Sequence, residues 1–317
     1  MKILIVCSGN FNLSFEISQA FIYDQIQALK KLGVEIDLFL VKGMGMKGYV
    51  KNLKALKKKI KTNNYTLVHA HGGLSGLLSN LQRMLPVITT FHGTDINNPK
   101  LRLFSSLAHL LNYKSIFVST ALRNKVKFFT KKQYVIPCGV DFSLFHPMDK
   151  NHVKKELGLS ENKKYILFSS SFENSNKNYP LLHEALKINP NDQIEVIELK
   201  NYTRKEVVKL MNAVDICTMT SFMEGSPQFI KEAMACNCPI VSTDVGDVKD
   251  IIKHTDGCYL TTFSAKDVAL KIDKALNFGK KTNGREHLKN FDNELIAQKL
   301  FQVYQKTIKR KINDHNC

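Results

Sequence analysis

Short apolar runs alternate with helically spaced apolar residues along most of the chain. Residues 2–9 (KILIVCSG) are an apolar run that ends at a glycine, residues 18–33 carry apolar side chains at helical spacing, and residues 34–41 (VEIDLFLV) are a second run. Short apolar runs are typical of strands, and the helical spacing is typical of a helix packed on a sheet. This order predicts two parallel strands joined by a crossover helix.

The same alternation continues along the rest of the chain. Further strands are predicted at residues 65–72, 86–93, 114–120, 133–139, 164–171, 193–199, 215–221 and 239–246. Helical patterns separate most of these runs, which predicts an α/β fold with parallel sheets. Residues 140–152 (VDFSLFHPMDKNH) interrupt the alternation and are predicted to be a linker. We therefore predict two tandem Rossmann-like, doubly wound domains.

These two domains are predicted to span residues 1–147 and 148–295. A chain of 317 residues, 44% of them hydrophobic, is long enough for two such cores. Ligands of doubly wound sheets bind beyond the carboxyl ends of the strands, so the predicted site is an interdomain cleft. No apolar run approaches the roughly 20 residues that a membrane-spanning helix needs. The opening MKILIVCSG predicts a strand and not a signal peptide.

The cysteines and two of the histidines are candidate metal ligands. Seven cysteines, an odd number without a paired framework, fit a reducing cytosol. Cys236 and Cys238 are spaced C-x-C, but no second pair of cysteines or histidines lies nearby, so two small buried residues are preferred to a zinc site. His69 and His71 face one side of a strand. A third ligand is not apparent, so a polar strand end is the preferred interpretation.

Positive charge is concentrated in the first half of the chain. The formal net charge is +18; residues 1–145 hold 20 Lys and Arg against 6 Asp and Glu, a balance of +14. Between Leu38 and Val140 the only acidic residue is Asp95. Such a field attracts an anionic surface, either acidic lipid headgroups or nucleic acid. No helix-turn-helix, zinc-finger or aromatic stacking pattern is evident, so nucleic acid is not expected as a partner.

The segment KNLKALKKKIK (51–61) has six lysines in eleven residues, with one narrow apolar stripe at Leu53, Leu56 and Ile60. One interpretation is an ordinary surface helix packed on the sheet. The preferred one is a basic face that contacts an anionic membrane. The predicted membrane contacts are Lys51, Lys54, Lys57, Lys58, Lys59 and Lys61.

The stretch EGSPQFIKE (224–232) places two carboxylates eight positions apart, around a turn and the start of a helix. Pro227 fits the first helical turn and Ser226 fits its N-cap. Free backbone N–H groups at a helix start bind phosphate, and Glu232 on the same helix could accept hydrogen bonds from sugar hydroxyls. The alternative is that Ser-Pro only caps a helix and Glu232 faces water. Spacing alone leaves both open.

The block DICTMTSFMEGSPQFIKEAMACNCPIVSTDVGDVKDII resembles the retaining glycosyltransferases of family 4, which have the GT-B fold and the signature Glu, seven residues, Glu. The resemblance implies that Glu232 holds the ribose, that Glu224 contacts the transferred sugar, and that the backbone of the turn holds the distal phosphate. The implied donor-binding residues are therefore Lys177, Glu224, Gly225, Ser226, Pro227, Gln228, Phe229 and Glu232.

Other segments resemble the same family. FHGTD (91–95) is similar to a strand end whose His, here His92, faces the reacting sugar. ILFSSSFENSNKNYPLLHEAL resembles the loop whose Lys, here Lys177, clamps the diphosphate. VIPCGVDFSLFHP is similar to the interdomain connection. The terminal helix, at about 296–317, resembles one that packs back on the N-terminal domain. SSSFENSNKN also resembles a subgroup linked to cell-surface polysaccharide or teichuronic-acid-type assembly.

Two departures from the family pattern concern the same pocket. Many members carry an Arg where this chain has Ser169–Ser171, which leaves one expected cation of the diphosphate clamp unassigned. Many also have a glycine pair in the first loop, where this chain has SGNFNLS. The predicted acceptor-side residues are Gly9 and Asn10 in that loop, together with His71 and Gly72.

We therefore predict a retaining glycosyltransferase that moves a hexosyl or N-acetylhexosaminyl group from a nucleotide diphosphate-sugar to a glycan or lipid-linked acceptor. It would act at the cytoplasmic face of the membrane in surface polysaccharide assembly, with His92, Glu224 and Lys177 as catalytic residues. No D-x-D sequence ends a predicted strand, so no metal and no further cofactor are expected. The alternatives are a non-catalytic protein that binds anionic polymers on a degenerate GT-B fold, and an epimerase that acts on nucleotide sugars.

Overall fold

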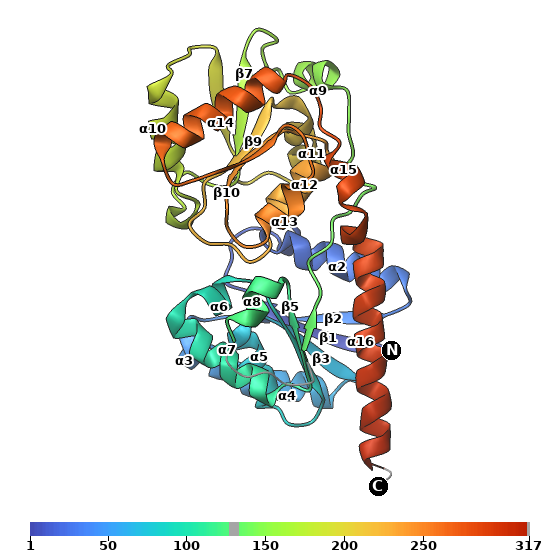
Figure 1. The fold of residues 1–317 in the computed structure, drawn as a ribbon. Helices are drawn as coiled ribbons and strands as arrows, with labels where there is room; N and C mark the ends of the chain where they lie inside the picture. The colour runs from blue at the N-terminus through green and yellow to red at the C-terminus, as the bar shows by residue number, and fades with distance from the viewer. Residues whose placement is uncertain (127–132, 316–317) are drawn as a thin grey trace. The chain divides into compact units, whose positions relative to one another are not determined.

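The computed structural model of the chain describes residues 1–126 and 133–315. It consists of two compact units, Met1–Gly139 with Asn293–Cys317 (unit 1) and Val140–Asp292 (unit 2). Each unit is a parallel sheet with helices on both faces (Figure 1). The predicted α/β class with two doubly wound parallel sheets is confirmed.

The boundaries between the units differ from the predicted ones at residues 147 and 295. The first lies after Gly139 because the predicted linker packs into unit 2, where Val140 and Phe145 are fully buried in the core. The linker interpretation of residues 140–152 is therefore wrong. The second boundary lies after Asp292, where the last helix begins.

The sheet of unit 1 has six parallel strands within the described residues, in the order β2-β1-β3-β4-β5-β6. Its order reverses at β1, because β2 lies on one side of β1 and β3 on the other. The strands are β1 (Lys2–Ser8), β2 (Glu35–Val41), β3 (Leu67–His71), β4 (Val87–Phe91), β5 (Lys114–Phe117) and β6 (Gln133–Val135). The helices are α1 (Phe15–Ser18), α2 (Ala20–Lys31), α3 (Gly45–Val50), α4 (Leu53–Lys61), α5 (Gly73–Asn80), α6 (Thr94–Asn97), α7 (Pro99–Leu111), α8 (Thr120–Asn124) and α16 (Asn293–His315).

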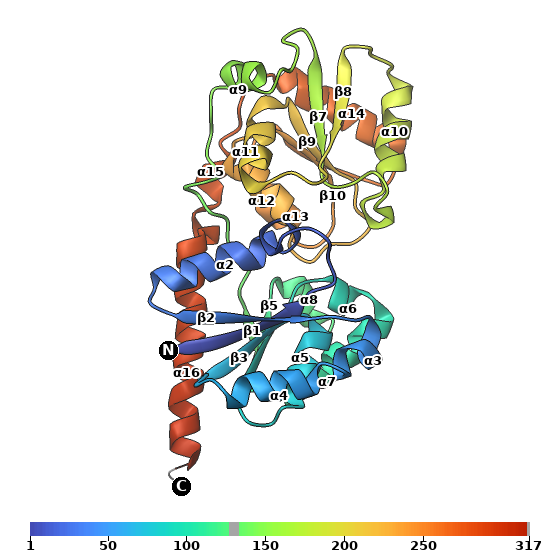
Figure 2. The ribbon, with the colours of Figure 1, turned by 180° about the vertical axis from the view of Figure 1, so that it is seen from behind.

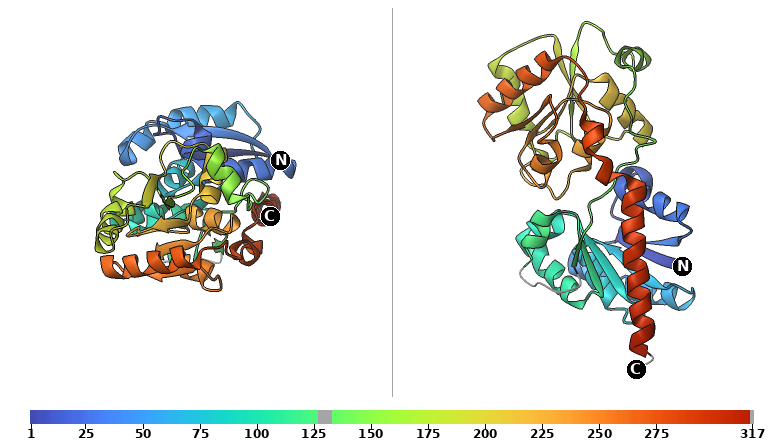
Figure 3. Two further views of the ribbon diagram at one scale, coloured as in Figure 1. Left: turned by 90° about the horizontal axis from the view of Figure 1, so that it is seen from above. Right: turned by 45° about the vertical axis from the view of Figure 1, so that its right-hand side comes forward.

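Successive side chains of a strand point to opposite faces of the unit 1 sheet, and helices pack on both faces. Ile3 and Ile5 of β1 pack against α2 and α16, whereas Leu4 and Val6 pack against α3, α4 and α5. Figure 2 shows α2 from behind, and the right panel of Figure 3 shows α16 running beside the unit 1 sheet. Helix α16 contributes Ile296, Ala297, Leu300, Val303 and Tyr304 to the buried core. The last helix is thus part of unit 1.

The sheet of unit 2 has five parallel strands in the part of the chain that the structure describes, in the order β11-β10-β9-β7-β8. Its order reverses at β7, which pairs with β8 on one side and β9 on the other. The strands are β7 (Lys164–Phe168), β8 (Ile194–Glu198), β9 (Ile216–Met219), β10 (Ile240–Thr243) and β11 (Cys258–Thr261). The helices are α9 (Lys150–Glu156), η1 (Ser175–Lys177), α10 (Tyr179–Ile188), α11 (Arg204–Ala213), α12 (Gln228–Ala235), α13 (Val248–Ile252), α14 (Ala265–Phe278), α15 (Gly284–His287) and η2 (Lys289–Phe291).

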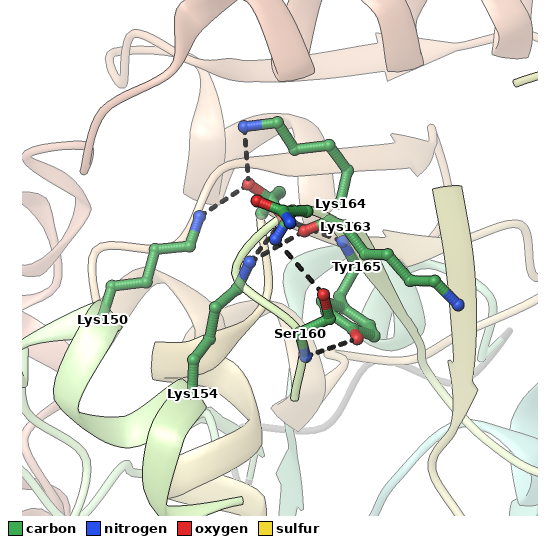
Figure 4. A network of polar contacts seen from close by, with 8 residues as sticks. Lys150, Lys154, Ser160, Lys163, Lys164 and Tyr165 are labelled. Atoms are coloured by element: carbon green, nitrogen blue, oxygen red, sulfur yellow. Dashed lines mark hydrogen bonds and ion pairs between the residues drawn. The ribbon is translucent and has the colours of Figure 1, made fainter. Parts of the chain in front are cut away.

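A lysine network ties α9 to the amino ends of β7 and β9 (Figure 4). The buried carboxylate of Asp215 accepts a hydrogen bond from Lys150 Nζ at 2.7 Å and from the Tyr165 N–H at 2.8 Å. Lys154 Nζ lies 3.9 Å from the same carboxylate and donates to the Lys163 carbonyl at 2.9 Å. These contacts fix the edge of the sheet opposite the carboxyl ends of the strands.

Candidate active site

The predicted donor-binding residues of unit 2 lie beyond the carboxyl ends of β7 and β9, where the strand order reverses. Ligands of open α/β sheets bind at this position. Lys177 ends the short helix η1 after β7, and Glu224 lies in the loop after β9. The Lys177 Nζ lies 2.7 Å from Glu224 Oε1, and the two side chains are 19% and 16% exposed. The structure therefore brings these two predicted residues together as a partly buried ion pair.

Hydrogen bonds between the two loops hold this ion pair in place. The Thr220 hydroxyl donates to the carbonyl oxygens of Lys177 and Asn178, both at 2.9 Å. The Phe222 N–H donates to the Asn176 carbonyl, and the Asn176 amide donates to the Met223 carbonyl, also at 2.9 Å. These hydrogen bonds fix the backbone on both sides of the Lys177–Glu224 pair.

Glu232, on α12, forms a second ion pair that the sequence interpretation missed. Arg204 Nη1 donates to Glu232 Oε1 at 2.7 Å, and both side chains are almost fully buried. The Arg204 guanidinium also stacks 4.6 Å from the centre of the Phe145 ring. The alternative in which Glu232 faces water is wrong, because its carboxylate is buried and paired with Arg204.

Arg204 lies at the start of helix α11. Thr203 and Glu206 form a capping box at the start of α11, so Arg204 is the first residue of that helix. A cation is unfavourable near the positive end of a helix dipole. The carboxylate of Glu232 compensates for this unfavourable position of Arg204.

Ser226 does not cap α12, contrary to the sequence prediction. Helix α12 begins at Gln228 with Pro227 in the cap position, and no side chain caps it. The Ser226 hydroxyl instead donates to Asp247 Oδ2 at 2.7 Å and accepts from Lys231 Nζ at 3.1 Å. Burial raises the pKa of Asp247, while Lys231 and Ser226 oppose that rise. These buried contacts of Ser226 hold the turn that precedes α12.

The turn of Gly225 lies against the loop after β10. Gly246 has a φ of +66°, and a Cβ there would lie 2.9 Å from the Gly225 carbonyl oxygen. A side chain at Gly246 would displace the backbone that leads into α12. The first N–H groups of a helix point away from its body, a position that is suited to bind phosphate. In α12 these groups belong to Gln228 and Phe229, at the start of the helix that carries Glu232.

Three histidines gather on one face of the unit 1 sheet, at its carboxyl edge. His71 Nδ1 lies 2.9 Å from His92 Nε2, and the two rings stack with their centres 5.2 Å apart. His69 lies deeper, 2.6 Å from the Tyr304 hydroxyl on α16 and 2.8 Å from the Thr90 hydroxyl. The structure thus brings the predicted His92 and His71 into contact and assigns His69 to the interior.

Burial keeps the inner histidines neutral. It lowers the pKa of His69 to about 3, with a further contribution from His92. It also lowers the pKa of His71 well below its usual value, and His69 and His92 contribute in the same direction. His92 also lies beside Phe21 of α2 and 3.7 Å from the Cys138 sulfur. The two inner histidines therefore offer uncharged hydrogen-bonding groups on this face of the sheet.

Asp95 organises the turn that follows His92. Its carboxylate accepts the N–H groups of Gly93 at 2.8 Å and His92 at 3.1 Å. Burial raises the pKa of Asp95 to about 6, although these N–H groups oppose the rise. Asp95 thus caps the turn that follows β4.

The remaining acceptor-side residues lie at the same edge of the unit 1 sheet, where its strand order reverses between β1 and β3. Gly9 and Asn10 follow β1, and Gly72 follows β3. The Asn10 side chain clamps Gly43, since it donates to the Gly43 carbonyl at 2.8 Å and accepts the Gly43 N–H at 2.9 Å. A Cβ at Gly9 would lie 2.8 Å from Leu40 Cβ, so the close approach of two strands requires this glycine.

The lysine-rich segment forms α4 as predicted, with Leu56 and Ile60 buried against the sheet. Lys51, Lys54, Lys58 and Lys61 are exposed, whereas Lys57 and Lys59 are half-buried. None of the helices among the described residues combines the length and the apolar character that crossing a membrane requires.

Comparisons with known proteins agree with this architecture. The family of glycosyl transferases group 1 matches residues 175–293, and Glycosyltransferase Family 4 matches residues 45–144. Among solved structures, sucrose-phosphate synthase from Thermosynechococcus elongatus superposes with a TM-score of 0.81 at 17% identity, covering 98% of this chain and 99% of that one. Anabaena HepE in complex with UDP gives 0.75 at 17% identity, covering 96% of this chain and all of that one.

Two curated relatives share part of the sequence. An N,N'-diacetylbacillosaminyl-diphospho-undecaprenol alpha-1,3-N-acetylgalactosaminyltransferase of Campylobacter jejuni is 33% identical over 112 residues, which are 33% of this chain and 30% of that protein. A putative teichuronic acid biosynthesis glycosyltransferase of Bacillus subtilis is 25% identical over 236 residues, 66% of this chain and 60% of that protein. In both cases the match spans less than two thirds of the relative's length.

Proposed function

This chain belongs to the family 4 glycosyltransferases of the GT-B fold, and from that premise we propose that it transfers a sugar from a nucleoside diphosphate-sugar to a glycan or lipid-linked acceptor. We propose a hexosyl or N-acetylhexosaminyl group, retention of configuration, and action at the cytoplasmic membrane face in surface polysaccharide assembly. The observation that carries the proposal is the Lys177–Glu224 ion pair beside the start of α12.

The departing diphosphate gains negative charge as the bond from the sugar carbon to the phosphate oxygen breaks. The Lys177 ammonium would leave Glu224 and bind this diphosphate, and the first N–H groups of α12 would bind its distal phosphate. Groups that are fixed before the reaction stabilise developing charge without reorganisation. Glu224, released from Lys177, would then accept hydrogen bonds from the hydroxyls of the transferred sugar.

No protein nucleophile is needed in this proposal. The acceptor hydroxyl attacks the sugar carbon from the face that the diphosphate leaves, and its proton passes to the departing phosphate oxygen. His92, which His71 contacts at 2.9 Å, would hydrogen-bond the transferred sugar. Imidazole nitrogens can donate or accept hydrogen bonds, which suits the hydroxyls of a sugar. No metal is required, since Lys177 and the helix amides supply the positive potential.

Names of related proteins support the substrate classes. HepE structures were determined with UDP and with UDP-glucose, which supports a nucleotide-sugar donor. The Campylobacter relative and an Escherichia coli galactosyltransferase, 23% identical, have names that specify diphospho-undecaprenol acceptors, which supports a lipid-linked acceptor. Membrane contact through the lysines of α4 fits such an acceptor.

The donor assignment can be tested through the ribose. Nucleoside diphosphate-sugars are first screened by thermal shift, because a bound donor raises stability by mass action. For the nucleotide that binds, affinities of the diphosphate and of its 2′,3′-dideoxy form are compared in the wild type and in Glu232→Gln. We expect the wild type to prefer the ribose form and the variant to lose that preference. Unchanged preference in a folded variant would refute the ribose role of Glu232.

A further inference from the structure

Helix α7 exposes four leucines on one face. Leu103, Leu107, Leu110 and Leu111 are 64%, 43%, 48% and 58% exposed, and their spacing places them on one side of the helix. The opposite side, with Ser105, Ala108 and His109, is buried in unit 1. Large contiguous apolar surfaces on soluble proteins mark interaction sites. We call the four leucines the leucine face.

Cations lie at both ends of the leucine face. Lys100 is exposed in the first turn of α7. At the other end, the exposed Arg83 and Leu111 line the same hollow of about 470 Å³, together with Met84, Leu85 and Tyr113 among others. Arg102 does not join this surface, because its guanidinium donates to the Ile96 carbonyl at 2.7 Å. The leucine face therefore continues into an apolar hollow with a basic rim.

The surroundings of the leucine face are poor in negative charge. The single acidic residue between Leu38 and Val140 is Asp95, whose carboxylate is taken up by the backbone of its own turn. Helix α7 and the lysine-bearing α4 cover the same face of the unit 1 sheet (Figure 1). An apolar strip with cations at its ends complements a surface that is apolar beneath a layer of phosphates.

We propose that the leucine face inserts into the headgroup region of an anionic lipid membrane, with α7 lying in the plane of the interface. The leucines would reach the boundary of the acyl chains, Lys100 and Arg83 would contact lipid phosphates, and the lysines of α4 would add long-range attraction. This inference rests on the membrane contact in the proposed function. It adds an apolar contribution to the free energy of membrane binding, which salt does not screen.

A second copy of the chain is the competing occupant of the leucine face. A symmetric dimer through this face would bring the same patch of each copy together. Such a dimer would bring Lys100, Arg83 and the α4 lysines close to the same cations of the other copy. Asp95 is the single acidic residue between Leu38 and Val140, so little negative charge would neutralise them. Charge complementarity therefore favours the anionic membrane.

The absence of tryptophan from the sequence allows a direct test. Leu107→Trp places a single tryptophan in the leucine face, and Leu270→Trp places one at a leucine of α14 in unit 2 that is 50% exposed. Both are mixed with vesicles of phosphatidylcholine alone and of phosphatidylcholine with phosphatidylglycerol. We expect the emission of Leu107→Trp to shift to the blue with the anionic vesicles and that of Leu270→Trp to stay constant. Equal behaviour of the two proteins would overturn the proposal.

A second experiment separates insertion from electrostatic attraction. The double variant Leu107→Asn with Leu110→Asn should lower partitioning onto anionic vesicles by about tenfold or more, at low and at high salt alike. Lys100→Gln should lower it about fivefold, and only at low salt. Leu270→Asn is the matched control and should change nothing. A double variant that still sediments with vesicles like the wild type would overturn insertion.

Two further measurements distinguish this inference from its rival and from the proposed function. Sedimentation velocity that shows a wild-type dimer dissolved by the leucine double variant would overturn the membrane proposal in favour of self-association. Nucleotide binding by the same double variant should equal that of the wild type, because α7 is remote in sequence from Lys177 and Glu232. Lost vesicle binding with intact nucleotide binding supports the membrane surface whatever the donor.

Discussion

The carboxyl edges of the two sheets carry different kinds of polar groups. In unit 2, Lys177 holds Glu224 and Arg204 holds Glu232, each at 2.7 Å. In unit 1, the edge carries histidines, and burial lowers the pKa of His69 and His71 so that they stay neutral. Charged pairs can exchange a partner for a charged ligand, whereas neutral rings suit hydroxyl groups. The difference fits a charged ligand on unit 2 and an uncharged ligand on unit 1.

The two ion pairs of unit 2 also differ from each other. Lys177 ends the short helix η1 and keeps some exposure, so its ammonium can leave Glu224 for a phosphate. Arg204 is anchored at a helix start, lies on the Phe145 ring and is nearly inaccessible. A buried charge that loses its partner is strongly destabilising, whereas a partly exposed one is screened by water. Arg204 therefore orients Glu232, and Lys177 is available to bind a ligand.

The largest effect is expected for Arg204→Met. The substitution leaves the Glu232 carboxylate buried without its cation, which should lower the free energy of unfolding by about 3–5 kcal/mol. Urea unfolding measures this change. The matched control is Lys209→Met on the same helix, which breaks the exposed pair of Lys209 with Glu156 and should cost less than about 1 kcal/mol. Equal, small losses in both variants would show that the Arg204–Glu232 pair is not a structural element.

Lys177→Met should affect catalysis more than stability. Without its ammonium the departing diphosphate loses one preorganised cation, and kcat should fall by about 10²–10³-fold. The midpoint of urea unfolding should change little, because the Glu224 left behind can be reached by water. Transfer rates and unfolding are measured on the same preparations.

The control for Lys177→Met is Lys187→Met, an exposed lysine in the last turn of α10. It removes the same charge from the following helix and should leave both quantities unchanged. A normal kcat in Lys177→Met would show that the Lys177 ammonium does not stabilise the departing diphosphate.

Much of the fold was predictable because its strands are short, apolar and separated by helices. The runs KILIVCS and VITTF became β1 and β4. Helix α7 was not predicted, although it lies between two predicted strands. Its exposed Leu103, Leu107, Leu110 and Leu111 fill the face that is polar in an ordinary surface helix, so the helical period is hidden. The surface that hid this helix from sequence reasoning is the one that we assign to the membrane.

The candidate site was predictable where its residues follow strands directly. Glu224 and His92 follow β9 and β4, and Lys177 follows the loop after β7. The contacts between them were not predictable, because a side-chain partner from another element leaves no local pattern. Arg204 meets Glu232 across 28 positions, and His69 meets Tyr304 across 235. Val140 and Phe145 were assigned to a linker because a short apolar segment beside Pro and Lys residues does not reveal which core it enters.

The pH dependence of stability tests the neutral state of the unit 1 histidines. The folded pKa of His69 is about 3 and its ordinary value is 6.5, so the unfolded chain takes up a proton in this range and the folded chain does not. The stability that the neutral His69 contributes is therefore fully present above about pH 6.5 and is lost as the pH falls toward about 3. Urea midpoints at several pH values measure the slope, which His69→Gln should reduce.

Asp95 changes the pH dependence of stability in the direction opposite to His69. Its folded pKa of about 6 lies above the ordinary 3.8, so the folded chain binds the extra proton and stability falls as the pH rises through that window. Asp95→Asn should therefore steepen the acid loss that His69 causes. His183→Gln, at an exposed position of α10, is the control and should leave the profile unchanged. A profile that His69→Gln does not alter would mean that the charge state of His69 is the same in both states of the chain.

The smallest effect is expected on removal of divalent metal ions. In the proposed mechanism Lys177 and the N–H groups at the start of α12 neutralise the diphosphate, so treatment with EDTA should leave the transfer rate unchanged. The comparison between the sheets makes this test informative, because Glu224 becomes available to a cation once Lys177 moves to the donor. A rate that falls with EDTA and recovers with Mg²⁺ would show that the reaction requires a divalent cation, which Glu224 could help to hold. In that case Lys177 would serve to hold Glu224 before the donor arrives.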